Sequence, residues 1–139
     1  MTLPMADASK PIPSPTDATQ PFWSSCSSGV LRLRRCSHCD RFRGPSRIVC
    51  ECGQSDFVWT DACGRGRIFS YTVVHRAPDP AFRAELPYVV AIVALDEGPH
   101  LLSNVIGCAP EAVSIDMPVE AVFETLADDI GTAKFKPIG

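Results

Sequence analysis

The sequence predicts a mostly β protein in which a short N-terminal helix and a small metal-stapled ribbon precede a closed barrel of five strands. Two observations predict this fold class. Four cysteines lie between residues 36 and 52 in two close pairs, which is the spacing of metal ligands. From residue 64 onward, short segments rich in aromatic and β-branched residues alternate with turns that contain glycine or proline. We therefore divide the chain into a disordered tail (1–20), a helix with a ribbon (21–63) and a barrel domain (64–139).

The N-terminal region has two parts. Residues 1–20 are rich in proline, serine and threonine and hold few large apolar side chains, so we expect them to be disordered. A short helix is predicted from Pro21 to Gly29, because proline is favoured in the first helical turn and glycine after the last. Phe22 and Trp23 are its large apolar side chains and must pack either on the ribbon or on a partner protein.

The cysteines Cys36, Cys39, Cys50 and Cys52 predict a structural zinc site. Zinc takes four thiolates in a tetrahedron, and two tight turns joined by a loop can supply them. Residues 30–36 and 56–62 predict the strands on either side. A ribbon of this size cannot bury a core of its own and needs the metal as a staple. With four protein ligands, no position stays open for water or substrate, so the site is structural rather than catalytic.

The second cysteine pair is shorter than the usual Cys-x-x-Cys spacing, because only Glu51 separates its members. The shorter turn loses a backbone N–H that would donate to sulfur. The tetrad then closes with a distorted second corner, takes His38 or Cys63 as a substitute ligand, or binds the metal more weakly. We favour closure, since Gly53 follows directly and provides the backbone freedom that a tight turn requires.

The barrel strands are predicted from alternating segments. Residues 66–77 place Ile68, Ser70, Thr72 and Val74 on one face and Phe69, Tyr71, Val73 and His75 on the other. Residues 88–95 and 100–107 form a hairpin with Gly98 and Pro99 at its turn, and 78–87 form a loop. Residues 117–126 turn Val119, Ala121 and Phe123 inward, and 133–138 form the last strand. We favour an OB-like barrel, but the pattern alone does not separate it from an SH3-like one.

Charge and hydropathy bound the partners and the compartment. Residues 22–67 hold eight arginines and four acids, for a net charge of +4, whereas residues 77–139 hold ten acids and three bases, for a net charge of −7. The front half therefore suits anionic partners better than the back half does. The longest apolar run, 88–95, is strand-sized, so no membrane span is expected. Without a secretory signal, the cysteines are expected to be thiols or metal ligands in a cytoplasmic protein.

The chain shows no constellation typical of an enzyme. The three histidines, His38, His75 and His100, are scattered, and no nucleophile elbow, phosphate loop or dinucleotide fingerprint occurs. Cys108 follows a strand but has no base near it in the sequence, so we interpret it as a small buried thiol. Asp128 and Asp129 are expected to form a turn. We predict that the protein is not an enzyme.

Almost the whole chain after the tail resembles a bacterial and archaeal family that pairs an N-terminal rubredoxin-like zinc ribbon with a C-terminal OB fold, long described as a domain of unknown function. The resemblance is carried by "PFW" (21–23), "LRLRRCSHCDRFRGPSRIVCECG" (31–53), "GRGRIFSYTVVHRAP" (64–78), "PYVVAIVALDEGPHLLSNVIG" (87–107) and "IDMPVEAVFE" (115–124). The family usually has two residues inside the second cysteine pair, commonly beginning with proline, and this chain departs from it there.

The resemblance implies a function without chemistry of its own. Members of the family are accessory subunits of thiolase-like enzymes, which include acyl-CoA acetyltransferases and thiolase-type aldolases of steroid side-chain degradation. It implies that the OB domain sits against the thiolase-like partner and helps to form or cover its acyl-CoA site. It also implies that the ribbon and the preceding helix contribute to the interface, in a hetero-oligomeric complex.

Several residues suit such an interface, because arginine grips phosphate and the pantetheine of CoA fits an apolar groove. Arg65 and Arg67 lie in the "GRGR" entry to the barrel, where glycines permit close approach of the backbone. The remaining candidates for CoA or partner binding are Phe22, Trp23, Arg41, Arg43, Arg47, His75, Arg76 and Phe82.

The alternative function is binding of single-stranded nucleic acid. Ribbons and OB folds both do this, and Phe69, Tyr71 and His75 could stack on bases. The acidic barrel half and the lack of lysine from residue 11 to residue 133 disfavour it, since such proteins need a basic groove.

Overall fold

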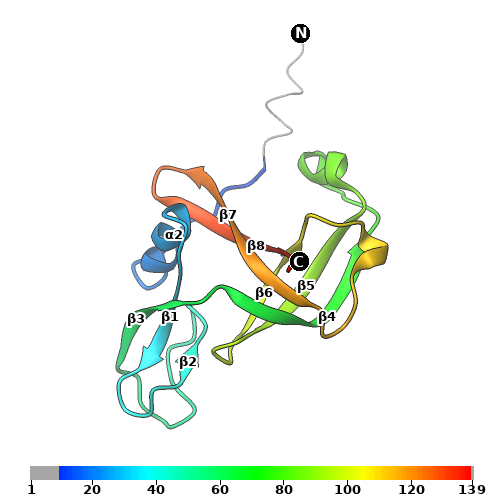
Figure 1. Ribbon diagram of the computed structural model, residues 1–139. Helices are drawn as coiled ribbons and strands as arrows, with labels where there is room; N and C mark the ends of the chain where they lie inside the picture. Colours follow the sequence, from blue (N-terminus) through cyan, green and yellow to red (C-terminus); the bar gives the residue numbers. More distant parts are fainter. Residues whose placement is uncertain (1–9, 139) are drawn as a thin grey trace.

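The computed structural model describes residues 10–138, so residues 1–9 of the predicted tail lie outside the described residues. Figure 1 shows a small ribbon domain beside a barrel, with one α-helix packed between them. The ribbon domain holds α2 (Gln20–Ser27), β1 (Leu31–Cys36), β2 (Phe42–Arg43) and β3 (Phe57–Ala62). The barrel holds β4 (Arg65–Val74), the 3₁₀ helix η1 (Pro80–Glu85), β5 (Tyr88–Leu95), β6 (His100–Val105), the 3₁₀ helix η2 (Pro110–Ala112), β7 (Pro118–Ala127) and β8 (Ile130–Pro137).

The ribbon is a three-stranded antiparallel sheet in the order β2-β1-β3. β1 pairs with β3 along its whole length, from Leu31 opposite Ala62 to Cys36 opposite Phe57. The two predicted strands are confirmed. β2 was not predicted, because two residues are too few to show a periodic pattern.

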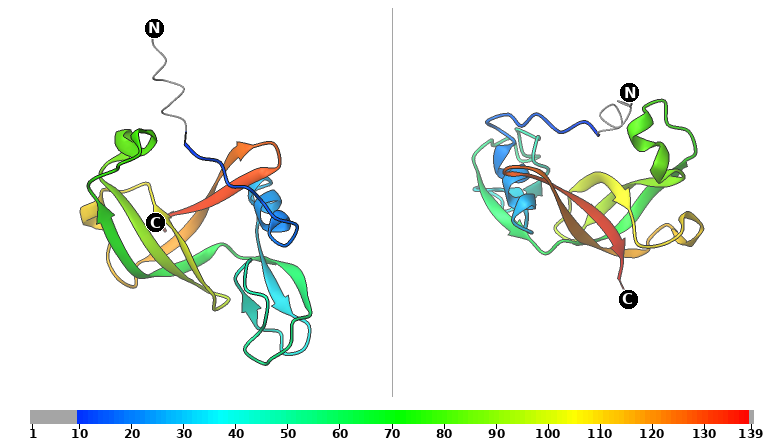
Figure 2. Two further views of the ribbon diagram at one scale, coloured as in Figure 1. Left: turned by 180° about the vertical axis from the view of Figure 1, so that it is seen from behind. Right: turned by 90° about the horizontal axis from the view of Figure 1, so that it is seen from above.

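The barrel is closed in the order β4-β5-β6-β8-β7. β4 returns to β7 to close it, with Gly66 opposite Val119, and β6 pairs with β8 in parallel at Val105 and Phe135. Its third and fifth strands thus pair in parallel, and its first and fourth strands close the cylinder. This is the OB arrangement, so the order of the strands decides what the sequence pattern left open. Figure 2 shows the closed cylinder from two further sides.

A bulge in β4 overturns the predicted alternation of residues 66–77. Ile68 and Ser70 pair with the consecutive residues Val93 and Ile92, so residue 69 is extra. Beyond the bulge, the side of the strand that carries Ile68 continues through Tyr71 and Val73, not through Ser70, Thr72 and Val74. The expectation was wrong because strict alternation assumes an unbroken strand.

One hydrophobic core joins helix, ribbon and barrel. Phe22 of α2 and Leu31 and Leu33 of β1 are buried in the same cluster as Ile68 and Phe135 of the barrel. Val119 is fully buried, and Ala121 and Phe123 pack partly buried against this core, as predicted. The ribbon therefore gains its apolar packing from α2 and the barrel, while the end that carries its four clustered cysteines lies beyond that core.

Two contacts hold α2 on the β7–β8 hairpin. A side chain at Gly131 would place its Cβ only 2.3 Å from the backbone nitrogen of Ser27, so glycine permits the close approach of β8 to the helix. At the turn, the Ser24 hydroxyl donates to the Asp129 carboxylate at 2.8 Å. Asp129 has a φ of 59° and belongs to the tight turn, as expected for the "LADDIG" stretch.

Residues 10–19 lead into α2, which begins at Gln20 rather than Pro21. The Lys10 ammonium pairs with Glu85, and the backbone oxygen of Ala18 accepts from Arg34 at 2.9 Å. The division of the chain at residues 20 and 63 stays a prediction. Within residues 10–138, no helix has the length and apolarity needed to cross a membrane.

Candidate functional site

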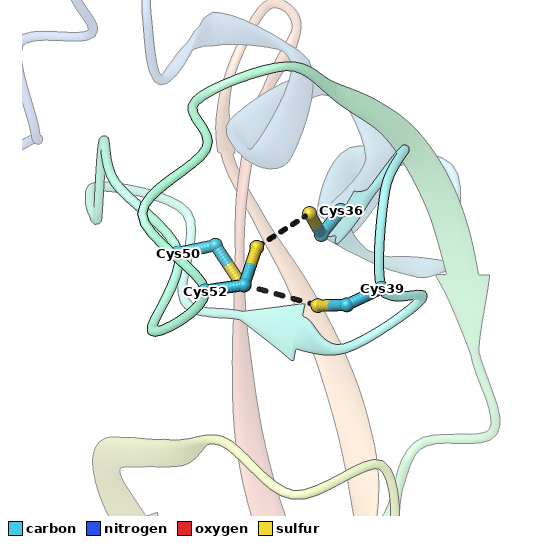
Figure 3. Close-up of side chains that lie close together, drawn as sticks. All are labelled: Cys36, Cys39, Cys50 and Cys52. Carbon is cyan, nitrogen blue, oxygen red and sulfur yellow. Dashed lines mark hydrogen bonds between the residues drawn. The ribbon is translucent and has the colours of Figure 1, made fainter.

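The four predicted ligands converge at one end of the ribbon (Figure 3). Cys36 ends β1, Cys39 lies in the turn that follows, and Cys50 and Cys52 come from the second turn. The sulfurs of Cys36 and Cys52 are 3.7 Å apart, those of Cys39 and Cys50 are 3.5 Å apart, and all four lie within 4.8 Å of one another. No disulfide joins them, so the cluster is a set of free thiols that could hold a metal ion.

The backbone of the first turn favours the thiolate form of Cys36. The N–H groups of Cys39 and His38 point at its sulfur and lower its pKa to about 6. In the second turn, the N–H of Cys52 lowers the pKa of Cys50 in the same way. Two backbone N–H groups thus point at the sulfur of Cys36, whereas one points at the sulfur of Cys50. The shorter spacing predicts this loss of one donor.

Gly53 allows the shorter pair to close. Its φ is +91°, and its N–H donates to the backbone oxygen of Cys50 at 2.9 Å. The two residues considered as substitute ligands, His38 and Cys63, make other contacts. The His38 imidazole is 3.5 Å from Asp56, and the Cys63 thiol lies 3.8 Å from the Asp96 carboxylate, outside the cluster.

Arg43 supports the loop that joins the two cysteine turns. It is 4% exposed, and its guanidinium donates to the backbone oxygens of Arg47, Ile48 and Ser55 at 2.8–3.0 Å. The structure therefore places this candidate residue inside the ribbon, with most of its donors already engaged. The sequence did not distinguish Arg43 from Arg41 and Arg47, because all three lie in one short segment that has no pattern to mark one of them as buried.

Arg34 is the second buried arginine, and sequence reasoning did not single it out. It faces Arg43 across β1 and β2, and both guanidinium groups stack on Phe57, at 4.4 and 5.3 Å from the ring centre. Burial, and then the charge of Arg43, lowers the pKa of Arg34. The only sequence signal was the aromatic content of β3, whose Phe57 and Trp59 lie on this face.

Arg41 and Arg47 line a cleft of about 650 Å³ between the ribbon loop and the β5–β6 turn, which Arg43 also borders. Glu51 lies 3.4 Å from Arg41, and Asp40 and Glu97 are further acids in the lining. Three arginines are thus matched by three acids. The structure brings these candidates together but surrounds them with compensating charge.

The candidate residues on the barrel lie apart from that cleft. Arg65 borders a second hollow with Asp61 and Glu120, and the Arg67 guanidinium donates to the backbone oxygen of Asp116 at 3.0 Å. His75 and Arg76 are exposed just beyond β4, and Phe82 is half-buried on η1. The structure does not bring these residues into one site with the ribbon arginines.

An apolar hollow of about 230 Å³ lies between α2 and β6. Trp23 lines it together with Pro45 of the ribbon loop and Leu101 and Leu102 of β6, and the ring of Phe22 forms its buried floor. Of these, Leu102 is 69% exposed. The two helix aromatics therefore pack mainly on the barrel, and Trp23 also borders an accessible apolar surface.

Further apolar side chains are exposed outside this hollow, and the sequence did not identify them as a surface. Phe69 is 56% exposed and stacks on His100 at 4.5 Å, while Ile48 and Val49 are exposed on the ribbon loop. Phe69 points outward because its neighbour Ile68 is buried, but alternation alone does not show which side of a strand faces the core.

The cysteines outside the cluster show no catalytic arrangement within the described residues. Burial raises the pKa of Cys26 to about 11, which keeps this thiol neutral. Cys108 packs half-buried against the core, as expected. Burial, and then the carboxylates of Glu97 and Asp96, raises the pKa of Cys63 against the opposing effect of the Arg65 N–H.

The barrel region resembles a known protein family. Residues 59–124 match the family model described as the C-terminal OB-fold domain of ChsH2. A DUF35 domain-containing scaffold protein of Methanocaldococcus jannaschii is 38% identical over 121 residues, which cover 81% of this chain and 82% of the relative. A scaffold protein of the same description from Methanothermobacter thermautotrophicus is 37% identical over 97 residues.

A second group of relatives is longer. The chain is 33% identical to the 3-oxo-4,17-pregnadiene-20-carboxyl-CoA hydratase alpha subunit of Mycobacterium tuberculosis. It is 42% identical to a Thermomonospora curvata protein named "Probable enoyl-CoA hydratase alpha subunit". The matches span 37% and 31% of these two relatives, so the chain corresponds to about a third of their length.

Solved structures agree with the fold. A chain of the Ltp2-ChsH2(DUF35) aldolase superposes with a TM-score of 0.78 and 34% identity, and the match covers 90% of this chain and 98% of that one. A DUF35 protein of unknown function from Sulfolobus solfataricus superposes with a TM-score of 0.60 at 17% identity and supports the fold alone.

Proposed function

The chain belongs to the DUF35 family, and from this membership we propose that it is a non-catalytic scaffold subunit of a thiolase-like enzyme. In this proposal it binds a thiolase-fold partner, either an acetyltransferase or a thiolase-type aldolase, and helps to form or cover the acyl-CoA site of that partner. The observation that carries the proposal is the likeness, over almost the whole chain, to the DUF35 component of an aldolase complex.

The surface supports a protein partner. The hollow beside Trp23 and Leu102, the stacked Phe69 and the ribbon residues Ile48 and Val49 expose apolar groups on both domains. Interfaces gain most of their binding energy from a few aromatic and aliphatic anchors that fill such hollows. An exposed apolar surface of this kind also costs solubility unless a partner covers it.

The acyl-CoA part of the proposal rests on the names of relatives and on the arginines. Two relatives are named as subunits of hydratases that act on CoA thioesters. Arg41, Arg47 and Arg65 are exposed and can reach a phosphate group at an interface, whereas Arg43 is engaged inside the ribbon. We propose Arg41, Arg47, Arg65, Arg67, His75, Arg76, Phe82, Phe22 and Trp23 as residues of, or beside, the shared surface, with Arg43 as their internal support.

We also propose that the cysteine cluster holds Zn²⁺ in a structural role. Zinc–sulfur bonds of about 2.3 Å place the corners of a tetrahedron about 3.8 Å apart. The observed separations of 3.5 and 3.7 Å are close to that value. Because metal-bound thiolates must stay reduced, the proposal includes a cytoplasmic location.

The zinc proposal is tested by measuring metal content in the purified protein and in its Cys52→Ser variant. We expect about one zinc per chain in the wild type and a clear loss in the variant, because a hydroxyl replaces the fourth thiolate. Equal zinc in both proteins would exclude Cys52 as a ligand.

The nucleic-acid alternative has less support. The relatives reported above are named for scaffolding and for CoA thioesters, and the barrel half carries a net charge of −7. Phe69 and Tyr71 are exposed but lie on an acidic domain, where single strands would be repelled.

The scaffold function is tested by co-expressing the chain with a thiolase-fold protein encoded in the same gene cluster. We expect acyl-transfer or retro-aldol turnover of the partner to rise when the chain is present, and the chain alone to show no turnover. A partner with equal turnover with and without the chain would contradict the proposal.

A further inference from the structure

The N-terminal segment lies across one outward face of the barrel. We call residues 10–18 the arm, and we call the outward side of β5, β6 and β8, between η1 and the β7–β8 turn, the OB face. In Figure 2 the arm runs over the barrel from the side of η1 to α2. In OB folds, the face of the second and third strands, bordered by the first and last hairpin loops, is the usual ligand-binding surface.

The two ends of the arm are fixed at opposite borders of this face. At one end, the Lys10 ammonium pairs with Glu85 and lies 5.9 Å from the centre of the Phe82 ring. At the other end, Ala18 accepts a hydrogen bond from the buried Arg34. The first residue of α2, Gln20, donates to the backbone oxygen of Asp129 in the β7–β8 turn at 3.2 Å.

Between these ends, the arm and the face enclose a groove of about 200 Å³. Pro11 and Pro13 form its arm side, and the aromatic rings of Phe82 and Tyr88, 6.4 Å apart, form the wall opposite. Asn104, Thr132 and the ion pair of Glu124 with Lys134 complete the floor. An aromatic wall with an acid at one end is the chemistry that recognises extended, proline-rich segments flanked by a basic residue.

Both the arm and the η1 loop that it contacts have restricted backbone freedom. Lys10, Ile12 and Ser14 each precede a proline, which biases their backbone toward extended conformations and lowers the entropy lost on docking. On the barrel side, Asp79 caps η1 through the Ala81 N–H at 2.9 Å, and Arg83 donates to the backbone oxygens of Ala77 and Pro78. The loop that carries Phe82 and Glu85 is therefore held before the arm arrives.

We propose that the OB face is a binding site for an extended Lys-Pro-x-Pro segment and that the arm of the same chain occupies it. The arm acts as a strap that covers the face on which OB folds usually bind their ligands, so any other ligand must displace it. Phe82, which is also proposed above for the surface shared with the partner, then serves the strap in the isolated chain. The proposal goes beyond the scaffold function, since it concerns the isolated chain.

The test uses three full-length proteins and backbone amide NMR. The first is the wild type. In the second, Lys10→Glu, Pro11→Ala and Pro13→Ala detach the arm and leave the barrel side of the groove, with Phe82, Glu85 and Tyr88, unchanged. In the third, Phe82→Ala and Glu85→Gln remove the groove and leave the arm intact. A Glu111→Gln variant, altered on η2, serves as the control, and unchanged barrel resonances confirm the fold of each protein.

Two results are expected. In the wild type and the control, ¹H–¹⁵N heteronuclear NOEs of Ile12 and Ser14 match those of the barrel, and they fall in both other variants. A synthetic peptide of residues 10–16 shifts the amides of Phe82, Glu85 and Tyr88 in the arm-detached variant. It binds the wild type at least about tenfold more weakly, because the tethered arm competes at millimolar effective concentration.

Three results would overturn the proposal. The first is an arm in the wild type that is as mobile as in the variants. The second is an arm that stays ordered after Phe82→Ala and Glu85→Gln. The third is a peptide that shifts no residue of the groove in the arm-detached variant. None of these results bears on the thiolase-like partner, so the scaffold function and the strap stand or fall separately.

Discussion

Arg43 shows how the environment of a single residue sets its role. Three arginines lie in the ribbon loop, and Arg41 and Arg47 project into the cleft, while Arg43 turns inward and binds three carbonyl groups. Buried carbonyl groups without a donor are costly, so this one side chain fixes the loop between the two cysteine turns. The planar fork of the guanidinium suits this task, and an ammonium does not replace it.

We predict that Arg43→Lys destabilises the ribbon by about 2–4 kcal/mol, because hydrogen bonds to a charged group contribute about 1.5–3 kcal/mol each and lysine can keep only part of them. The loss should appear as weaker zinc binding in a chelator competition. Arg41→Lys is the matched control in the same loop and should change zinc binding little, since Arg41 makes an exposed ion pair. Equal effects of the two substitutions would contradict the role assigned to Arg43.

The cysteine cluster was predictable from the sequence because its signal is local. Four thiols at short spacing leave few other interpretations, and Gly53 identified how the short second turn closes. The burial of Arg34 and Arg43 was not predictable, because it depends on which side of a two-residue strand faces Phe57. The partners of an arginine are set by tertiary packing and cannot be predicted from composition.

At the scale of elements, the docking of α2 on β8 depends on a glycine. Gly131 faces the backbone of Cys26 and Ser27 at distances that no larger residue tolerates. The helix packs against β1, β7 and β8, so it joins the ribbon to the barrel. A shift of α2 would therefore move the hollow beside Trp23 as well.

We predict that Gly131→Ala destabilises the protein by at least about 1–3 kcal/mol, because the new methyl group forces the helix backbone away from β8. Chemical denaturation, followed by the fluorescence of Trp23 and Trp59, measures this loss. Gly44→Ala is the matched control, since its Cβ would meet nothing within 4 Å. A Gly131→Ala protein as stable as the Gly44→Ala protein would show that α2 does not pack as described.

The elements themselves were largely predictable, and their registers were not. Segments 88–95 and 100–107 alternate cleanly and form the predicted hairpin around Gly98. In β4 the bulge at residue 69 inverted the expected faces, because the cause lies in pairing with β5 rather than in the strand's own residues. The contacts of Lys10 could not be predicted from the sequence either, since its partner Glu85 is distant along the chain.

At the scale of the whole molecule, the zinc that we propose and the hydrophobic core stabilise different parts. The core joins α2, β1 and the barrel, whereas the two cysteine turns lie beyond it and hold the possible metal site. The proposed division of labour follows: the shared core holds α2, β1 and the barrel together, and the cysteine end of the ribbon folds only around zinc.

Removal of the metal is therefore expected to loosen the ribbon end and leave the barrel intact. Hydrogen exchange after chelation should lose protection at the amides of Cys36 and Cys50, which donate to Arg41 and Gln54. Barrel amides such as Val93 and Phe135 should keep theirs. Loss of protection throughout the chain would contradict this division, and so would unchanged protection at the cysteine turns.

In the proposed function, this DUF35 chain is a subunit that binds a thiolase-fold protein. The most direct measurement is the mass of the mixture, by size-exclusion chromatography with light scattering, after the zinc-loaded chain is combined with a thiolase-fold protein of the same organism. We expect one peak with a mass that contains both proteins, and a weaker complex for Leu102→Glu, which places a charge in the apolar hollow. Separate elution of the two proteins at micromolar concentration would contradict it.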